Sequence, residues 1–173
     1  MRLASILLLI GVVCWAPLGF AQDDIQKHRS CAYCRMDRKT FGYSRMLVEY
    51  SDGASVGTCS IRCIVLDLTQ NLTKLPCSLK VGDYQTKKLI DADKAFWVVG
   101  GNKRGVMTQT AKWAFEKESG AKEFINSYGG DSATFHEALK AAYEEIYEEV
   151  KDTLERAEER KARGSSPCKP PSR

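Results

Sequence analysis

The sequence lacks the side-chain combinations on which most enzymes depend. It contains only two histidines, and no serine or cysteine has a recognisable histidine partner that could activate it as a nucleophile. No glycine-rich loop opens a predicted helix, and no pair of carboxylates stands out as a general acid and base, because Asp91 and Asp93 are typical of a turn. We therefore expect a protein that is not an enzyme.

Two further absences exclude whole classes of partner. Beyond the first 21 residues, no apolar run reaches the length of about 18 residues that a membrane helix needs, so we expect no membrane span in the mature chain. The net charge is only +4 over 173 residues, and no basic cluster is interleaved with aromatic side chains. Nucleic acid is therefore not an expected partner.

The first 21 residues have the pattern of an export signal. Arg2 supplies a positive charge, the stretch from Leu3 to Trp15 is apolar and uncharged, and small residues flank Phe20 where a signal peptidase cleaves. This pattern predicts cleavage after Ala21 and a periplasmic mature protein. Lipid anchoring at Cys14 is not expected, because the valine before it is too large for a typical lipobox.

Hydrophobic patterning predicts an α+β fold of two consecutive ββαβ units, over about 41–84 and 89–135. Each unit is a hairpin, a helix and a returning strand. In the first unit we expect strands over 41–50 and 54–58, a helix over 61–71 and a strand over 76–81. In the second we expect strands over 95–99 and 105–110, a helix over 120–127 and a short strand over 132–135.

The composition changes after the second unit. The segment 136–163 is mostly charged and predicts a long amphipathic helix with a narrow stripe at alternating spacings of four and three residues. This stripe consists of Tyr143, Ile146, Val150, Thr153 and Ala157. It predicts packing on the body of the protein or, as an alternative, a short coiled-coil seam that joins two copies as a homodimer. The tail, 164–173, is rich in proline and serine and is predicted to be disordered.

The densest group of metal-binding side chains lies in a polar leader, 22–40. There, Cys31-Ala32-Tyr33-Cys34-Arg35-Met36 places two thiols and a thioether within six residues. Soft sulfur ligands suit Cu(I), whereas carboxylates and carbonyls suit hard ions. Zinc also binds thiolates but rarely uses a thioether, so Met36 favours copper. Because Cu(I) accepts about two or three ligands without strict geometry, a flexible leader can supply most of such a site.

Alternatives to copper stay open from the residues alone. Six cysteines follow the predicted cleavage point, and in an oxidising compartment an even count is by default a disulfide framework. Cys31 and Cys34 could form a disulfide or the redox pair of a thiol–disulfide oxidoreductase, although a thioredoxin-like pair should follow a strand and open a helix. Haem attachment would need a histidine where Arg35 stands.

Cys59 and Cys63 flank the predicted start of the first helix, whose partial positive charge can lower the pKa of a thiol. With Cys31 and Cys34 they would make a four-cysteine zinc set or a second soft site. The alternative is that Cys59 is disulfide-bonded and Cys63 packs in the core as a small hydrophobic residue.

Other candidates have weaker patterns. Met107 falls in the second predicted strand of the second unit, where an isolated methionine is usually part of the core, but it is also a candidate thioether ligand. His28, three residues before Cys31, is a candidate nitrogen ligand. Cys77 and Cys168 have no partner by motif, and a disulfide between them is an alternative that the sequence does not test.

These segments together resemble a known family. Cys31 to Met36 is similar to the CxYCGM segment of the nitrous oxide reductase accessory protein (NosL) family, and a cysteine-bearing helix start follows at 58–63. The stretch from Ile90 to Gly100 is similar to the family's IDA..AFYVxG stretch, and Gly105-Val106-Met107 matches its Gly-x-Met element. With the closing elements at 114–115, 124 and 129–130, the resemblance covers about 31–135.

The resemblance implies a periplasmic Cu(I) chaperone that receives copper from a donor and passes it to a copper-receiving enzyme, with nitrous oxide reductase as the expected client. It implies Cys34 and Met36 as ligands and Met107 as a contributor. Our hypothesis from the sequence is therefore a Cu(I) site built from Cys31, Cys34 and Met36, with Met107 and Cys63 as further candidates.

Two departures from the family pattern matter. Arg35 replaces the glycine of the motif, which puts the tight backbone turn between Cys34 and Met36 in question and places a cation beside the site. The charged helix over 136–163 lies beyond the family core, so the client enzyme is an expectation of the resemblance alone.

Overall fold

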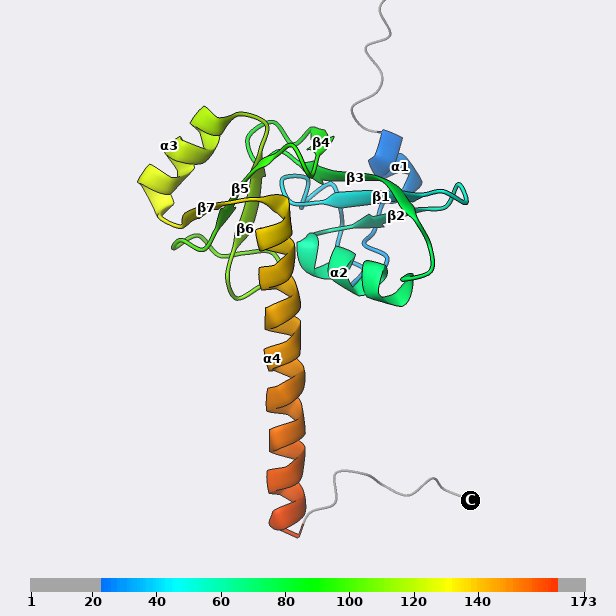
Figure 1. The fold of residues 1–173 in the computed structure, drawn as a ribbon, viewed down its shortest axis with the longest axis vertical. Helices are drawn as coiled ribbons and strands as arrows, with labels where there is room; N and C mark the ends of the chain where they lie inside the picture. Colours follow the sequence, from blue (N-terminus) through cyan, green and yellow to red (C-terminus); the bar gives the residue numbers. More distant parts are fainter. Residues whose placement is uncertain (1–22, 165–173) are drawn as a thin grey trace, which may run out of the picture.

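The computed structural model describes residues 23–164. The predicted export signal with its cleavage after Ala21, the candidate lipid anchor Cys14, the tail beyond Gly164 and Cys168 lie outside the described residues. Figure 1 shows that the described chain forms a body with two antiparallel sheets, from which one long helix projects.

The first unit is a hairpin, a helix and a returning strand. Its elements are β1 (Met46–Tyr50), β2 (Ser55–Thr58), α2 (Ile61–Gln70) and β3 (Pro76–Gly82). A further short strand, β4 (Leu89–Asp91), extends the sheet to the order β2-β1-β3-β4. Gly53 at the hairpin turn has a φ of +83°, a conformation that glycine adopts without strain.

The second unit repeats this order. Its elements are β5 (Phe96–Val99), β6 (Lys112–Phe115), α3 (Glu118–Tyr128) and β7 (Asp131–Ala133). The sheet order is β6-β5-β7, so in both units the first strand lies between its hairpin partner and the strand that follows the helix. The prediction of an α+β fold with two ββαβ units is confirmed.

Two strands lie elsewhere than the sequence predicted. The second strand of the second unit is β6 and not 105–110, which forms a loop. All four residues of β6 are buried, so this strand has no apolar–polar alternation that a pattern search could find. In the first unit the strand expected over 41–50 begins only at Met46, because the backbone amides of Ser44 and Arg45 both donate to the Phe41 carbonyl in a turn.

One apolar core joins the two units. The helix α2 buries Ile61, Ile64 and Val65, as the spacing in the sequence predicted. These residues belong to the same buried cluster as Trp97 of β5 and Phe135, the first residue of the last helix. The two units are therefore packed on each other through shared side chains.

The segment before β1 is packed on the body, whereas we expected a flexible leader. It begins with α1 (Asp23–Lys27), and the Asp24 carboxylate accepts hydrogen bonds of 2.9 Å from Arg38 and from Arg45. The side chains of these arginines are 0% and 1% exposed. This buried ion network anchors the loop that carries the cysteine motif.

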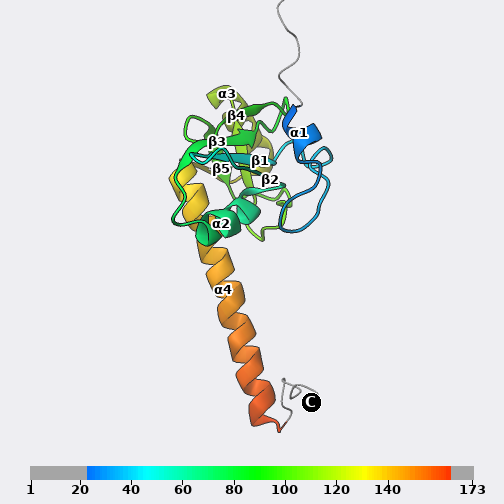
Figure 2. The same ribbon diagram turned by 90° about the vertical axis from the view of Figure 1, so that its right-hand side faces the viewer.

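The last helix, α4 (Phe135–Ala162), begins with a capping box between Thr134 and Glu137. Its first turns contact α2 and β5, and its later turns extend away from the body in both Figure 1 and Figure 2. Tyr147, Val150 and Leu154 on these later turns are exposed. No helix in the region 23–164 combines the length and the apolar character that crossing a membrane requires.

Candidate metal centre

Four cysteines meet where β2 leads into α2. The Sγ atoms of Cys31, Cys34, Cys59 and Cys63 all lie within 4.8 Å of one another. The sulfurs of Cys34 and Cys59 are 3.3 Å apart, and those of Cys59 and Cys63 are 3.9 Å apart. All four are free thiols, and three are buried while Cys34 is partly exposed. We call these four residues the thiol cluster.

Two parts of the chain supply the thiols. Cys59 precedes Ser60, the N-cap of α2, and Cys63 lies in the first turn, so the helix start presents both on one side. The other two cysteines come from the loop 30–37, which is closed by an antiparallel bridge between Ser30 and Asp37. The backbone amide of Ala32 donates to the carbonyl of Gly57 at 3.1 Å and thereby fixes this loop to β2.

The loop keeps its tight turn although an arginine replaces the glycine of the motif. The backbone amide of Arg35 donates to the Cys31 carbonyl at 3.1 Å, and that of Cys31 donates to the Met36 carbonyl at 2.8 Å. Arg35 has a φ of +66°, in the left-handed region that favours glycine. The arginine therefore adopts the conformation of the missing glycine, at a cost of about 1 kcal/mol.

A buried carboxylate joins the cysteine loop to α2. The Tyr33 hydroxyl donates to Oδ1 of Asp67 at 2.7 Å, and the Tyr50 hydroxyl donates to Oδ2. Asp67 is buried and lies one helical turn after Cys63. Burial and the contact with this carboxylate raise the pKa of both tyrosines, so both remain protonated donors at neutral pH. Tyr33 thus holds the two loop cysteines against the helix that carries Cys63.

The pKa values of the three buried thiols shift in opposite directions. Hydrogen bonds from the thiols of Cys59 and Cys63 lower the pKa of Cys31, and the backbone amides of Cys34 and Tyr33 lower it further. The same contacts with Cys31, together with burial, raise the pKa of Cys59 and of Cys63. In Cys59 and Cys63, the contacts with Cys31 and burial act against the lowering expected from the helix start.

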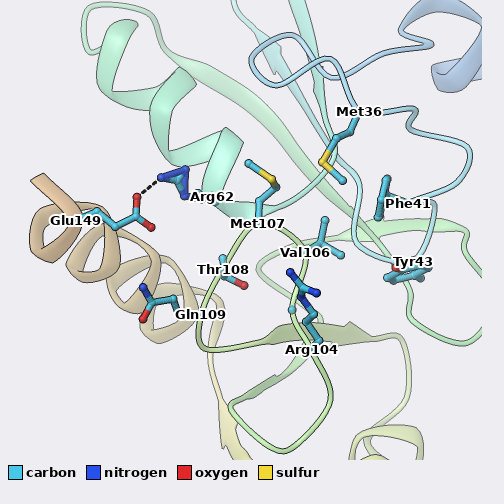
Figure 3. A pocket seen from close by; sticks show the side chains of 11 residues that line it. Met36, Phe41, Tyr43, Arg62, Arg104, Val106, Met107, Thr108, Gln109 and Glu149 are labelled. Atoms are coloured by element: carbon cyan, nitrogen blue, oxygen red, sulfur yellow. Dashed lines mark hydrogen bonds and ion pairs between the residues drawn. The ribbon is translucent and has the colours of Figure 1, made fainter. Parts of the chain in front are cut away.

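Two thioethers line a cavity of about 800 Å³ next to the thiol cluster. In Figure 3, Met36 from the cysteine loop and Met107 from the loop 105–110 extend into the same space. Met36 and Cys34 pack against the apolar cluster that contains the three buried thiols. The cavity therefore adjoins the apolar cluster in which the thiols lie.

Met107 is not the core residue that its type suggests. Its side chain is 42% exposed, and its φ of +60° is uncommon for a residue with a Cβ atom. Backbone strain of this kind concentrates at functional positions, because the surrounding structure must hold it in place. The exposed thioether, on a strained backbone, makes Met107 a candidate ligand.

Charged side chains of both signs line part of the cavity wall. Arg62 of α2 and Arg104 line it together with Glu149 of α4, and Arg62 forms an ion pair with Glu149 (Figure 3). This pair connects the first unit to the last helix at the cavity. Arg104 and Met107 line the same cavity, so a cation and an exposed thioether share its wall.

The structure brings most of the predicted ligands together. Cys31, Cys34 and Cys63 meet in the thiol cluster, and Met36 and Met107 meet in the cavity beside it. Cys59 belongs to the cluster although our ligand set omitted it. From its place at the helix start, the sequence analysis had grouped it with Cys31, Cys34 and Cys63 only as an alternative four-cysteine set.

Two other candidates lie outside the group. Nε2 of His28 is 3.0 Å from the Ser55 hydroxyl oxygen, and this histidine is not among the residues that surround the thiols. Cys77 is an exposed free thiol on β3. The redox pair hypothesis for Cys31 and Cys34 also lacks its expected context, because turns and not a helix follow Cys34 up to β1.

Comparisons with known proteins agree with this fold. The family model of NosL matches residues 22–143, which is more than half of the chain. A crystal structure of the copper chaperone NosL from Shewanella denitrificans is similar, with a TM-score of 0.50 and 22% identity, over 62% of this chain and 87% of that chain. No curated protein matches. On the extent of the family match, the chain belongs to the NosL family.

Proposed function

We propose that this protein binds Cu(I) at the thiol cluster and delivers it to a copper-receiving partner. The observation that carries the proposal is the convergence of six sulfur donors, four thiols within 4.8 Å of one another and two thioethers in the adjoining cavity. Thiolates and thioethers select Cu(I) over hard ions. Membership of the NosL family supports this proposal and agrees with the expectation that the protein is not an enzyme.

The arrangement provides a path for ligand exchange. Cys31, Cys59 and Cys63 are buried, Cys34 is partly exposed, and Met107 is exposed at the cavity. Cu(I) can therefore move outward from the buried thiols to Cys34 and then to the thioethers, exchanging one soft ligand at each step. Its oxidation state does not change along this path, and no covalent catalysis is needed.

The surroundings of the cavity favour a partner with negative charge near its own copper ligands. Arg104 places positive charge on the cavity wall, whereas the charge of Arg62 is offset by its ion pair with Glu149. Such charge steers an acidic surface into an encounter and speeds association. The partner in turn must offer soft ligands that can take the ion from thioethers.

The finer parts of the proposal rest on the family resemblance and on the predicted export signal. They are a periplasmic location, Cu(I) as the bound oxidation state, a separate protein as copper donor and nitrous oxide reductase as the client. In an exported protein the thiols must stay reduced to bind Cu(I).

An anaerobic Cu(I) titration against a competing chelator tests the binding step. We expect Cys34→Ala and Met36→Ala to weaken binding at least about tenfold, the scale on which changes at and around a metal site act. Cys77→Ala and Met46→Leu are matched controls, because Cys77 is exposed outside the cluster and Met46 is buried in the core. Unchanged affinity in both site variants would end the assignment.

A transfer experiment tests delivery separately. The copper-loaded protein is mixed anaerobically with copper-free nitrous oxide reductase, and the copper content of each protein is measured after separation. We expect copper to move to the enzyme, more slowly from Met107→Leu. If the wild-type chain binds copper but keeps all of it, the protein binds copper without delivering it to this client.

A further inference from the structure

The projecting part of α4 carries large apolar side chains that the rest of the described chain leaves uncovered. Tyr147, Val150 and Leu154 are 65%, 52% and 60% exposed, although side chains of this size gain free energy from burial. Tyr143, at the start of this part, is also exposed. A continuous exposed row of this kind is typical of a surface that binds another protein. We call these four residues the α4 stripe.

The α4 stripe has the spacing of a coiled-coil seam. From Tyr143 to Leu154 the intervals are four, three and four residues, which keep the side chains on one face of a helix. The sequence predicted a different stripe that included Ile146, but this residue packs against the core of the body. The family match ends at residue 143, so the α4 stripe lies almost wholly outside it.

We propose that two copies of this protein associate through the α4 stripe as an antiparallel pair of helices. In this arrangement Tyr143 lies opposite Leu154 of the second copy, and Tyr147 lies opposite Val150 of the second copy. Twofold symmetry repeats both contacts, so every residue of the stripe has an apolar partner. The proposal concerns one face of α4 and does not rest on the proposed copper function.

Charge beside the stripe favours the antiparallel arrangement over a parallel one. Residues that flank a coiled-coil seam meet across the two helices and set their orientation. In the antiparallel pair Glu144 lies beside Lys151 of the second copy, and symmetry forms this ion pair twice. In a parallel pair Lys151 would lie beside Ile146 of the second copy, which offers no charge. Glu144 and Lys151 now form exposed ion pairs with Lys140 and Glu148, and surface pairs of this kind exchange partners at little cost.

The face that the second helix would occupy is also open along the first turns of α4. His136 and Lys140 continue the α4 stripe toward the body at the same alternating spacing, and both are exposed. In Figure 1 and Figure 2 the later turns of α4 stand clear of the body, which leaves room for a second helix. Glu149, which pairs with Arg62 at the cavity, lies on a different face of α4, so the seam leaves the cavity wall uncovered.

Analytical ultracentrifugation of the reduced chain, from about 1 μM to about 1 mM, tests the proposal. Reductant is present because Cys77 is an exposed thiol that could form an intermolecular disulfide. We expect a dimer that dissociates on dilution, and we expect Leu154→Glu to weaken it at least about tenfold. Leu72→Glu is the matched control, because it places the same charge at an exposed leucine outside α4 and should leave the dimer unchanged. Far-UV circular dichroism checks that both variants are folded.

An exchange of charges tests the orientation of the helices. Lys151→Glu should weaken the dimer at least about twofold, and adding Glu144→Lys to the same chain should restore it, because the ion pair is then reversed. A dimer that the double change does not restore would overturn the antiparallel arrangement. A dimer that Leu154→Glu leaves intact would overturn the α4 stripe as its interface. A chain that stays monomeric over the whole concentration range would refute self-association and assign the stripe to a different partner. The Cu(I) affinity of Leu154→Glu should equal that of wild type, so these outcomes are separate from the proposed copper function.

Discussion

Removing the charge of Asp24 should destabilise the protein severely. This carboxylate is the shared partner of Arg38 and Arg45, whose side chains are 0% and 1% exposed. Asp24→Asn leaves both guanidinium groups buried without a counter-charge. Removal of one partner from a buried ion pair costs about 3–5 kcal/mol, and here one change removes the partner of two cations. We therefore expect the free energy of unfolding to fall by at least about 3 kcal/mol.

Urea denaturation followed by tryptophan fluorescence measures this loss. With an m-value of about 2 kcal/mol/M, a loss of about 3 kcal/mol lowers the unfolding midpoint by about 1.5 M. Asp52→Asn is the matched control, because its ion pair with Lys74 is about half exposed and contributes at most about 1 kcal/mol. Equal midpoints for the two variants would refute the argument that Asp24 anchors the cysteine loop.

Three further changes have defined outcomes. Arg35→Gly should raise the free energy of unfolding by about 0.5–1 kcal/mol, because the φ of Arg35 is +66°. Ala32→Gly in the same loop is the control and should not raise it. Thermal melts measure the stability of both variants. Met107→Leu should weaken Cu(I) binding in the chelator assay and leave the melting temperature unchanged, because the side chain is 42% exposed; an unchanged affinity would exclude the thioether as a ligand. Burial raises the pKa of Asp24, but Arg45 and Arg38 outweigh it and hold that pKa below the ordinary 3.8. The stabilisation by Asp24 is then complete above pH 3.8 and lost as pH falls through the lowered pKa, so the midpoint gap between wild type and Asp24→Asn should shrink in acid and stay constant above pH 5 or so.

The order of elements could be predicted because each unit has strong local patterns. A turn with Asp52 and Gly53 marks the first hairpin, and the apolar spacing of Ile61, Ile64 and Val65 marks α2. β6 was misplaced because burial on both faces removes its alternation. The neighbouring residues 105–110 were predicted as a strand from their pattern, but Gly105 and Met107 belong to a loop that lines the cavity.

Only part of the candidate metal centre could be predicted from the sequence. The motif from Cys31 to Met36 identifies soft ligands, since their density is a local property. That Cys59 completes the group depends on the loop 30–37 being folded onto β2 and α2, more than 20 residues away along the chain. The buried network around Asp24, which fixes that fold, has no recognisable pattern in the sequence, because it joins a short helix to two separate arginines.

The two ββαβ units share one topology, but only the first carries cysteines at the start of its helix. Cys59 and Cys63 stand one residue before the N-cap of α2 and at its third residue; the matching places around α3 are held by Glu116 and Gly120. The second copy is thus free of sulfur at that position and instead contributes Met107 and an apolar lining over the first. Substitutions in the second unit can therefore change the apolar side chains that cover the thiols, and so access to the proposed copper site, while the thiols themselves stay the same.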